Sequence, residues 1–177
     1  ITMTIRKATY ADIPDLMEIF RNARGIMRSS GNMNQWSDSY PSEEVSGNDI
    51  ENGYCYVLCD EGSVLATMAF IPGPDPTYAE IFDGKWIDDS PYYVIHRIAA
   101  RETGHGAARQ MLDWAFSYLE SKDIETGASV RTGIRIDTHR DNVIMHHILG
   151  RYGFVKCGTI LLADGSPRDA YQKVIQI

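Results

Sequence analysis

The sequence predicts a mixed α/β (α+β) fold, and three features of the chain support this prediction. Two apolar runs, residues 54–60 and 63–71, are separated by a glycine turn, which is typical of a β-hairpin. Residues 92–100 form a nearly continuous apolar run, as expected of a strand in the middle of a sheet. Apolar residues then recur at helical spacing over residues 107–119. Strands and helices therefore alternate along one chain.

The composition favours one folded domain over residues 1–177. A chain of 177 residues with 44% hydrophobic side chains is long enough to bury one core. The net charge of −7 argues against nucleic-acid binding through an overall positive field. The sequence has no long apolar run and no signal-peptide pattern, so we expect a cytoplasmic protein that contacts no membrane. Its 3 cysteines are too few for a disulfide framework.

The N-terminal part predicts one strand and two helices. Residues 3–9 alternate as a short strand, and residues 11–32 carry apolar side chains at helical spacing. Asp12 is the predicted cap of this helix, and a Gly-Asn pair ends it. A second, short helix is expected after the cap residue Ser42.

The segment before the central strand, residues 72–91, is rich in proline, glycine and aspartate. This composition predicts an insertion on the surface, and loops on a rigid scaffold frequently carry specificity. In the strand that follows, His96 and Arg97 are the polar residues and need partners. They face opposite sides of the sheet if the strand is regular.

The C-terminal part predicts three further strands and one helix. The strands are expected at residues 133–138, 153–162 and 169–177, and the helix at residues 141–152. The sequence contains no internal repeat and no linker.

The stretch RETGHGAARQML, residues 101–112, has glycines at 104 and 106 where a strand passes into a helix. A helix start leaves unpaired N–H groups at the positive end of the helix dipole, which favours an anion. The glycines allow a phosphate to approach the backbone, and Arg101 adds positive charge from the side. In a second interpretation, the glycines only permit a tight turn and close packing of the helix on the sheet.

The order of these elements resembles the GNAT superfamily of acetyl-CoA-dependent N-acetyltransferases from about residue 4 to residue 175. The family's pyrophosphate loop, Arg/Gln-x-x-Gly-x-Gly/Ala, is matched by Arg101, Gly104 and Gly106. The opening IRKATYADIPDLMEIF, the passage HRIAA and the block DNVIMHHILGRYGFVKCG are also similar. The resemblance implies a mixed, mostly antiparallel sheet of roughly six to seven strands, flanked by about four helices, with a splay between the two central strands.

The resemblance also implies how acetyl-CoA binds as the cosubstrate. Backbone groups of Ile98, Ala99 and Ala100 are expected to bond the pantetheine arm at the splay, between the strands that hold Ile98 and Ile136. Asn142 is expected to bond the pantetheine beside the thiol. The pyrophosphate is expected to lie on the amides of Gly104, His105, Gly106, Ala107 and Ala108. The acetyl group then passes directly to an amine, without an acyl-enzyme.

Two positions depart from the family pattern. Most relatives have a few more residues before the Arg/Gln of the loop, whereas here Ala100 leads directly into Arg101. The family's tyrosine that protonates the thiolate lies four residues before Gly-Phe, and Leu149 stands there in this chain. Tyr152, one turn further along the helix, is the candidate replacement; alternatively it only closes a buried stripe.

His96 is the predicted general base, because imidazole exchanges protons near neutral pH and His96 lies two residues before the acetyl-CoA-binding segment. A hydrogen-bonded core histidine is the alternative interpretation. We expect no metal at His139, His146 and His147, because neighbouring histidines on a helix point in different directions.

Three functions remain open on the sequence alone. The first is an N-acetyltransferase whose acceptor is a small-molecule or peptide amine, and the second is a CoA-binding sensor without turnover. The third is an unrelated dinucleotide-binding domain, which the position of the glycines in mid-chain disfavours. We favour the first, with the identity of the acceptor open and a homodimer as a hypothesis. Aromatic and acidic residues of the loops fit a cationic acceptor, or only anchor those loops.

Overall fold

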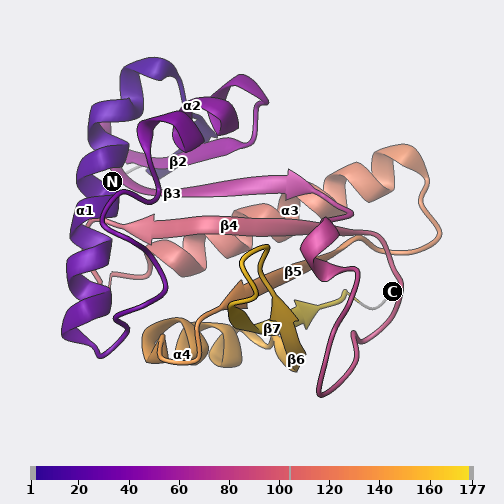
Figure 1. Cartoon of the computed structure of the whole chain (residues 1–177). Helices are drawn as coiled ribbons and strands as arrows, with labels where there is room; N and C mark the ends of the chain where they lie inside the picture. Colours follow the sequence, from indigo (N-terminus) through magenta and orange to yellow (C-terminus); the bar gives the residue numbers. More distant parts are fainter. Residues whose placement is uncertain (1–2, 104, 176–177) are drawn as a thin grey trace.

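Seven strands form one sheet in the described part of the chain, residues 3–103 and 105–175 of the computed structural model, in the order β1-β2-β3-β4-β5-β7-β6 (Figure 1). The strands are β1 Met3–Lys7, β2 Cys55–Asp60, β3 Ser63–Pro72, β4 Tyr92–Ala100, β5 Gly133–Thr138, β6 Val155–Leu161 and β7 Pro167–Lys173. Neighbouring strands are antiparallel throughout these residues except β4 and β5, which are parallel. The predicted mixed, mostly antiparallel sheet is confirmed.

Four α-helices in the described residues cover the two faces of this sheet. They are α1 Ile13–Ser29, α2 Glu43–Glu51, α3 Ala107–Thr126 and α4 Val143–Tyr152. Two short 3-10 turns also occur, η1 Tyr10–Asp12 between β1 and α1 and η2 Pro76–Tyr78 between β3 and β4. Apolar residues of α1 pack with β2 on one face, and those of α3 and α4 pack on the other. None of the helices described is both long and apolar enough to cross a membrane.

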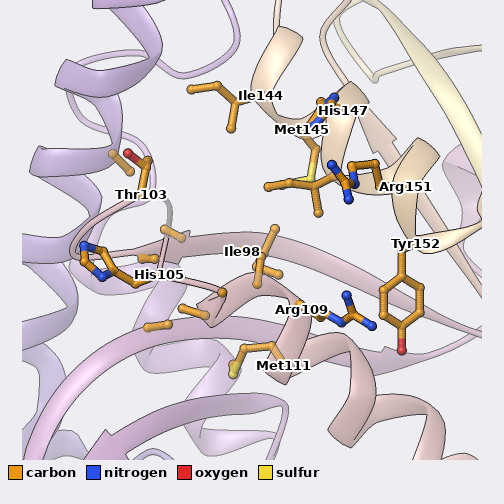
Figure 2. A pocket seen from close by; sticks show the side chains of 18 of the residues that line it. Ile98, Thr103, His105, Arg109, Met111, Ile144, Met145, His147, Arg151 and Tyr152 are labelled. Atoms are coloured by element: carbon orange, nitrogen blue, oxygen red, sulfur yellow. The ribbon is translucent and has the colours of Figure 1, made fainter.

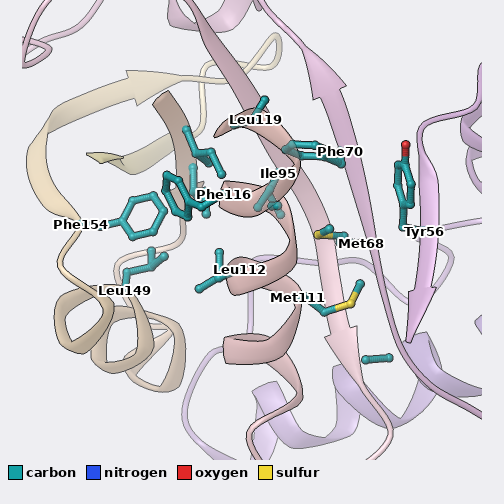
Figure 3. Close-up of a cluster of buried hydrophobic side chains, with 14 of the residues drawn as sticks. Tyr56, Met68, Phe70, Ile95, Met111, Leu112, Phe116, Leu119, Leu149 and Phe154 are labelled. Carbon is teal, nitrogen blue, oxygen red and sulfur yellow. The ribbon is translucent and has the colours of Figure 1, made fainter. Parts of the chain in front are cut away.

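The larger core lies between the sheet and the helices α3 and α4 (Figure 3). The predicted apolar stripe of α3 is buried here, at Met111, Leu112, Ala115, Phe116 and Leu119. Burying a large apolar side chain contributes about 1.5–3 kcal/mol, so this stripe fixes α3 firmly against the strands. The position of the start of α3 beside β4 follows from this packing.

The two central strands part after three residue pairs. β4 and β5 pair from Tyr92 with Gly133 to Val94 with Arg135, and no pairing is present between their described residues beyond that point. β4 nevertheless continues to Ala100, and β5 continues to Thr138. The predicted splay between the central strands is therefore confirmed.

Asp12 is the N-cap residue of α1, as predicted, but its side chain makes no capping hydrogen bond to this helix. Its carboxylate accepts two hydrogen bonds from Arg6, at 2.8 and 2.9 Å, and one from the backbone N–H of Thr9, at 2.8 Å. The guanidinium of the neighbouring strand engages the carboxylate, which stabilises the η1 turn before the helix. The second predicted cap is confirmed, because Ser42 accepts a bond from the N–H of Val45 at 3.2 Å.

A β-bulge in β4 overturns the expectation that His96 and Arg97 face opposite sides. Thr67 pairs with Ala99 and Ala69 pairs with His96, so β4 has one residue more than β3 in this interval. Arg97 has a φ of +54°, in the left-handed region. An extra residue shifts the alternation of side chains, so both polar side chains point to the α2 face of the sheet.

The segment 72–91 is not only a surface insertion, as its composition suggested. Tyr78 is 2% exposed, and its ring lies 5.3 Å from that of Trp86. Phe82 forms a β-bridge with Thr159, and the N–H of Ile87 donates to the side chain of Gln172 at 2.9 Å. Large aromatic groups draw this segment, which we call the insertion, onto the face of β5, β6 and β7.

Candidate functional site

A cavity of about 900 Å³ lies at the parting of β4 and β5, between the start of α3 and helix α4 (Figure 2). It also reaches α1, at Ala23, Ile26 and Met27. Apolar side chains line much of it, among them Ile98, Met111, Ile144, Met145 and Ile148. A cavity of this size suits a large, extended organic ligand.

The start of α3 forms one wall of the cavity. Gly106 is the N-cap residue with a φ of +75°, a conformation that glycine adopts without strain. A Cβ atom added there would meet no atom within 4 Å, so the backbone is open to close approach. His105, Ala107 and Ala108 also line the cavity, which brings these predicted residues together at a helix N-terminus. Gly104 lies outside the described residues.

The last residues of β4 form the floor. Ile98, Ala99 and Ala100 line the cavity as the sequence analysis placed them, beyond the last pair that β4 makes with β5. Arg101 follows, but its side chain is not among those that line the cavity. Its guanidinium contacts Asp15 at 2.9 Å and Glu18 at 2.8 Å, both on α1. Arg101 thus fastens the loop to α1, and its charge is already paired.

Asn142 lines the cavity, but its side chain has structural partners as well. Its Oδ1 accepts a bond from the N–H of Met145 at 3.1 Å, which caps α4. Its Nδ2 donates to Oε1 of Gln35 at 2.9 Å. Sequence reasoning placed Asn142 correctly at a helix start but gave no sign of Gln35, because this contact joins distant parts of the chain.

Tyr152 lines the cavity with its hydroxyl already bound. The hydroxyl donates to Oδ1 of Asp113 at 2.7 Å, and the ring stacks on Phe116 with centroids 5.7 Å apart. Burial and this bond to a carboxylate raise the pKa of Tyr152. Leu149, which stands at the position of the family's acid, is 0% exposed and belongs to the core. The contacts of Tyr152 are those of a structural residue.

Basic side chains gather at the mouth of the cavity. Arg109 and Arg151 lie beside Tyr152 at one end, and Thr103 and His105 lie at the other (Figure 2). Lys173 and His147 line the cavity too. Among the acidic lining residues, Asp113 is bound to Tyr152, and Glu102 lies 3.0 Å from His105. Two arginines on separate helices carry no motif, so the sequence gave no signal for this basic end.

His96 lies outside the cavity lining, on the opposite face of β4. Its Nε2 is 3.0 Å from Oδ2 of Asp75, and its Nδ1 is 4.0 Å from Oδ2 of Asp137. The hydroxyl of Tyr78 donates to the same oxygen of Asp137 at 2.6 Å. The hydrogen bond with His96 lowers the pKa of Asp75 to about 2, aided by the bonds from Thr77. Neither aspartate was singled out from the sequence.

In the described residues, no three His, Cys, Asp or Glu side chains gather as metal ligands. His146 is bound instead to the hydroxyl of Tyr171 at 2.5 Å and to the carbonyl of His139 at 3.1 Å. Tyr171 belongs to β7 and His139 to the loop before α4, so the ring of His146 is held by hydrogen bonds from two elements.

A parted sheet with a cavity that meets a helix N-terminus is the arrangement expected of a protein that binds a phosphate-bearing cosubstrate. The chain is similar to a GNAT-family acetyltransferase of Streptococcus agalactiae, with 34% identity, 99% of this chain and 96% of that chain covered, and a TM-score of 0.79. It therefore belongs to the GNAT family of acetyltransferases, whose acetyl donor is acetyl-CoA.

Two further solved structures share the fold. One is a GNAT-family acetyltransferase of Listeria monocytogenes, at 23% identity, with 98% and 95% of the two chains covered and a TM-score of 0.67. The other is the PaiA N-acetyltransferase of Thermoplasma acidophilum in complex with coenzyme A, at 14% identity, with 99% and 100% covered and a TM-score of 0.64. No family model and no curated protein matches the sequence.

Proposed function

We propose that this protein transfers the acetyl group of acetyl-CoA to a primary amine of a small molecule or peptide. The observation that carries the proposal is the cavity at the parting of β4 and β5, which joins the start of α3 to the end of β4. Membership of the GNAT family supports acetyl transfer as the reaction. The fold of an N-acetyltransferase that binds coenzyme A supports the amine as acceptor.

The residues of the cavity fit acetyl-CoA in three respects. The open backbone at Gly106 and the N-terminus of α3 suit the pyrophosphate. The unpaired edge of β4 from Ile98 to Ala100 suits the amide groups of the pantetheine arm. Arg109 and Arg151 at the mouth suit the third phosphate of CoA, on its ribose, because neither arginine forms a salt bridge within the described residues.

The chemistry asks for a neutral amine next to the thioester carbonyl. A C–N bond forms as the C–S bond breaks, and CoA leaves as the thiol. The acceptor amine gives up protons on the way, and His96 is the proposed proton acceptor. Tyr152 is left out of the proposed machinery, because its hydroxyl proton is donated to Asp113. Holding the amine and the thioester together supplies most of the rate in a reaction of this kind.

The test is release of CoA thiol from acetyl-CoA in the presence of spermidine, glucosamine, lysine and short peptides, with calorimetric titration of CoA in parallel. Turnover with at least one amine, together with saturable CoA binding, is the expected result. CoA binding without turnover across this panel would overturn the enzymatic proposal in favour of a CoA sensor. Absence of CoA binding would overturn the assignment of the cavity. The homodimer stays a prediction, which sedimentation analysis measures.

A further inference from the structure

Three side chains from three separate elements meet on the α2 face of the sheet, beside the parting of the central strands. Asp75 comes from the insertion, His96 from β4 and Asp137 from β5. Their side chains are 19%, 25% and 11% exposed, in that order, so they are shielded but open to a small ligand. His96 precedes Ile98, the first β4 residue of the cavity, by two positions.

Asp75 fixes which nitrogen of His96 carries the proton in the neutral ring. Its Oδ1 accepts bonds from the N–H of Thr77 at 2.9 Å and from the hydroxyl of Thr77 at 2.7 Å. Its Oδ2 faces Nε2 of His96 at 3.0 Å. An ionised carboxylate only accepts hydrogen bonds, so Nε2 is the donor. The neutral imidazole then has an unprotonated Nδ1, which is free to accept a proton.

Asp137 stands opposite that free nitrogen. The 4.0 Å between Nδ1 of His96 and Oδ2 of Asp137 is too long for a direct hydrogen bond. An ammonium nitrogen placed between them can lie about 2.9 Å from both atoms, which is the ordinary length of such bonds. The hydroxyl of Tyr78 holds the carboxylate in place from the insertion side.

The charges around this gap favour a cation. Asp75 and Asp137 contribute two carboxylates, against one imidazole and the neutral Thr77 and Tyr78. The neighbouring cation on β4, Arg97, is committed to the carboxylate of Asp49 at 2.8 Å. Arg135 on β5 lies against the rings of Trp86 and Tyr92 and donates to the carbonyl of Asp88 at 3.0 Å. Among the groups that contact His96 directly, the two carboxylates make the charge negative, which attracts a protonated amine.

Resting on the proposed function, we infer that Asp75, His96 and Asp137 form the acceptor-amine subsite of this enzyme. Asp137 binds the acceptor as its ammonium form, R–NH₃⁺, and Nδ1 of His96 takes one proton from it. The neutral amine then attacks the thioester carbonyl, the C–S bond breaks and CoA leaves. The thiolate of CoA takes the second proton of the nitrogen and leaves as the thiol, the amide keeps the third, and His96 then returns its proton to solvent. Asp75 is a positioning residue that acts through His96, and the acceptor class is the aliphatic amine that is protonated at neutral pH.

The tautomer of His96 tests the role of Asp75 without any turnover. Long-range ¹H–¹⁵N spectra of ¹⁵N-histidine-labelled protein, recorded at alkaline pH, distinguish the two neutral tautomers, and His96→Gln identifies the signals. The Nε2–H form is expected in the wild type. In Asp75→Asn the amide keeps the bonds from Thr77 but offers an N–H to Nε2, so a shift to the Nδ1–H form is expected. A wild-type Nδ1–H form, or no change in Asp75→Asn, would overturn the inference.

Asp164→Asn is the matched control for this exchange. Oδ1 of Asp164 accepts bonds from the N–H of Ser166 at 2.9 Å and from its hydroxyl, as Asp75 does from Thr77. This control is expected to leave the His96 signals unchanged. A cooperative thermal transition in both variants shows that Asp75→Asn folds.

Kinetics with the best amine of the panel separates the roles of the two aspartates. Asp75→Asn is expected to lower kcat at least tenfold, by a wrong tautomer, with the KM for the amine within about twofold. Asp137→Asn, which still accepts the bond from Tyr78, is expected to raise the KM for the amine about tenfold or more. Calorimetric CoA affinity is expected to stay unchanged in both. Wild-type turnover with unaltered kcat and KM in these variants would reject the subsite while leaving the proposed function intact.

Discussion

Arg97 and Asp49 form a two-point ion pair that ties the bulge of β4 to α2. Nε and Nη2 of Arg97 donate to the two carboxylate oxygens of Asp49, each at 2.8 Å. Nη1 of Arg97 also donates to the hydroxyl of Tyr40, at 3.1 Å. A residue with a left-handed φ persists only where its surroundings hold it, and this pair supplies that hold.

We therefore expect Asp49→Asn to lower the free energy of unfolding by about 3–5 kcal/mol, because it leaves the mostly buried Arg97 without its counter-charge. Urea unfolding followed by circular dichroism measures the effect. The exposed pair of Arg28 and Asp38 provides the control, since Asp38 is 87% exposed. Asp38→Asn is expected to cost below about 1 kcal/mol. Equal losses in the two variants would contradict this account of Arg97.

Tyr152→Phe is expected to reduce kcat less than about threefold, because the hydroxyl is held by Asp113 and its raised pKa disfavours proton release. The stability loss is expected to be about 1–2 kcal/mol, from one charge-assisted hydrogen bond. Steady-state thiol release and thermal melts check the two parts. Asp113→Asn is a companion variant, which keeps an acceptor for the hydroxyl. A large loss confined to kcat would instead identify Tyr152 as the acid that protonates the thiolate.

Gly106→Glu is expected to weaken CoA binding at least tenfold. The side chain places a negative charge at the N-terminus of α3, where the proposed pyrophosphate lies, and strains the backbone at a φ of +75°. Calorimetric titration of CoA is the measurement. Gly127→Ala, at the other end of α3 with a φ of +67°, carries the strain without facing the cavity. CoA affinity that matches between the two variants would remove the pyrophosphate from the start of α3.

The double variant Arg109→Gln with Arg151→Gln is expected to lower CoA affinity about tenfold at low salt, and less at high salt. Charges at the mouth of the cavity act through partly exposed contacts, which salt screens. Titrations at two ionic strengths check both statements. Arg21→Gln changes an exposed arginine of α1 and is expected to have no effect. A salt-independent loss would mean that the arginines support the fold instead.

The pKa of Asp75, lowered to about 2 by the bond with His96, makes stability depend on pH. Because the folded pKa lies below its ordinary value of 3.8, the carboxylate stabilises the fold above that value, and this contribution is lost as the pH falls toward 2. The difference in thermal midpoint between the wild type and Asp75→Asn is therefore expected to be largest near about pH 5 and to shrink toward about pH 2. A difference in thermal midpoint that grows as the pH falls would contradict this prediction.

Local patterns in the sequence predicted the elements with good success. The apolar stripe of α3 follows from hydrophobic periodicity, and the hairpin of β2 and β3 follows from the residues of its turn. Both signals lie within a short stretch of sequence, so both elements were predictable. The β-bulge at Arg97 depends on register between two strands, and the bond between Arg6 and Asp12 depends on a contact with β1. Both features depend on contacts with residues of another element. Periodicity alone therefore predicted a regular β4 strand and an ordinary cap at Asp12.

The candidate site was predictable where it lies on one continuous stretch. The passage from β4 through the loop into α3 is such a stretch, and the structure brings Ile98 and Gly106 to one cavity. His96 was also visible as a polar residue on an apolar strand. Its partners Asp75 and Asp137 lie on other elements and become neighbours only through the sheet and the insertion. A lone aspartate in a turn has too many ordinary roles to be singled out from sequence.

The insertion leaves the sheet after β3 and then attaches itself to strands on the far side of the parting. Tyr78 reaches Asp137 on β5, and Ile87 reaches Gln172 on β7. Because Asp75 of the same insertion contacts His96 on β4, the insertion links the strands on the two sides of the parting and limits how far they can separate. A ligand that binds between strands already held at this separation loses no binding free energy in separating them. Weakening the contacts of the insertion would therefore slow the reaction by misaligning the two substrates, while the rest of the fold remains intact.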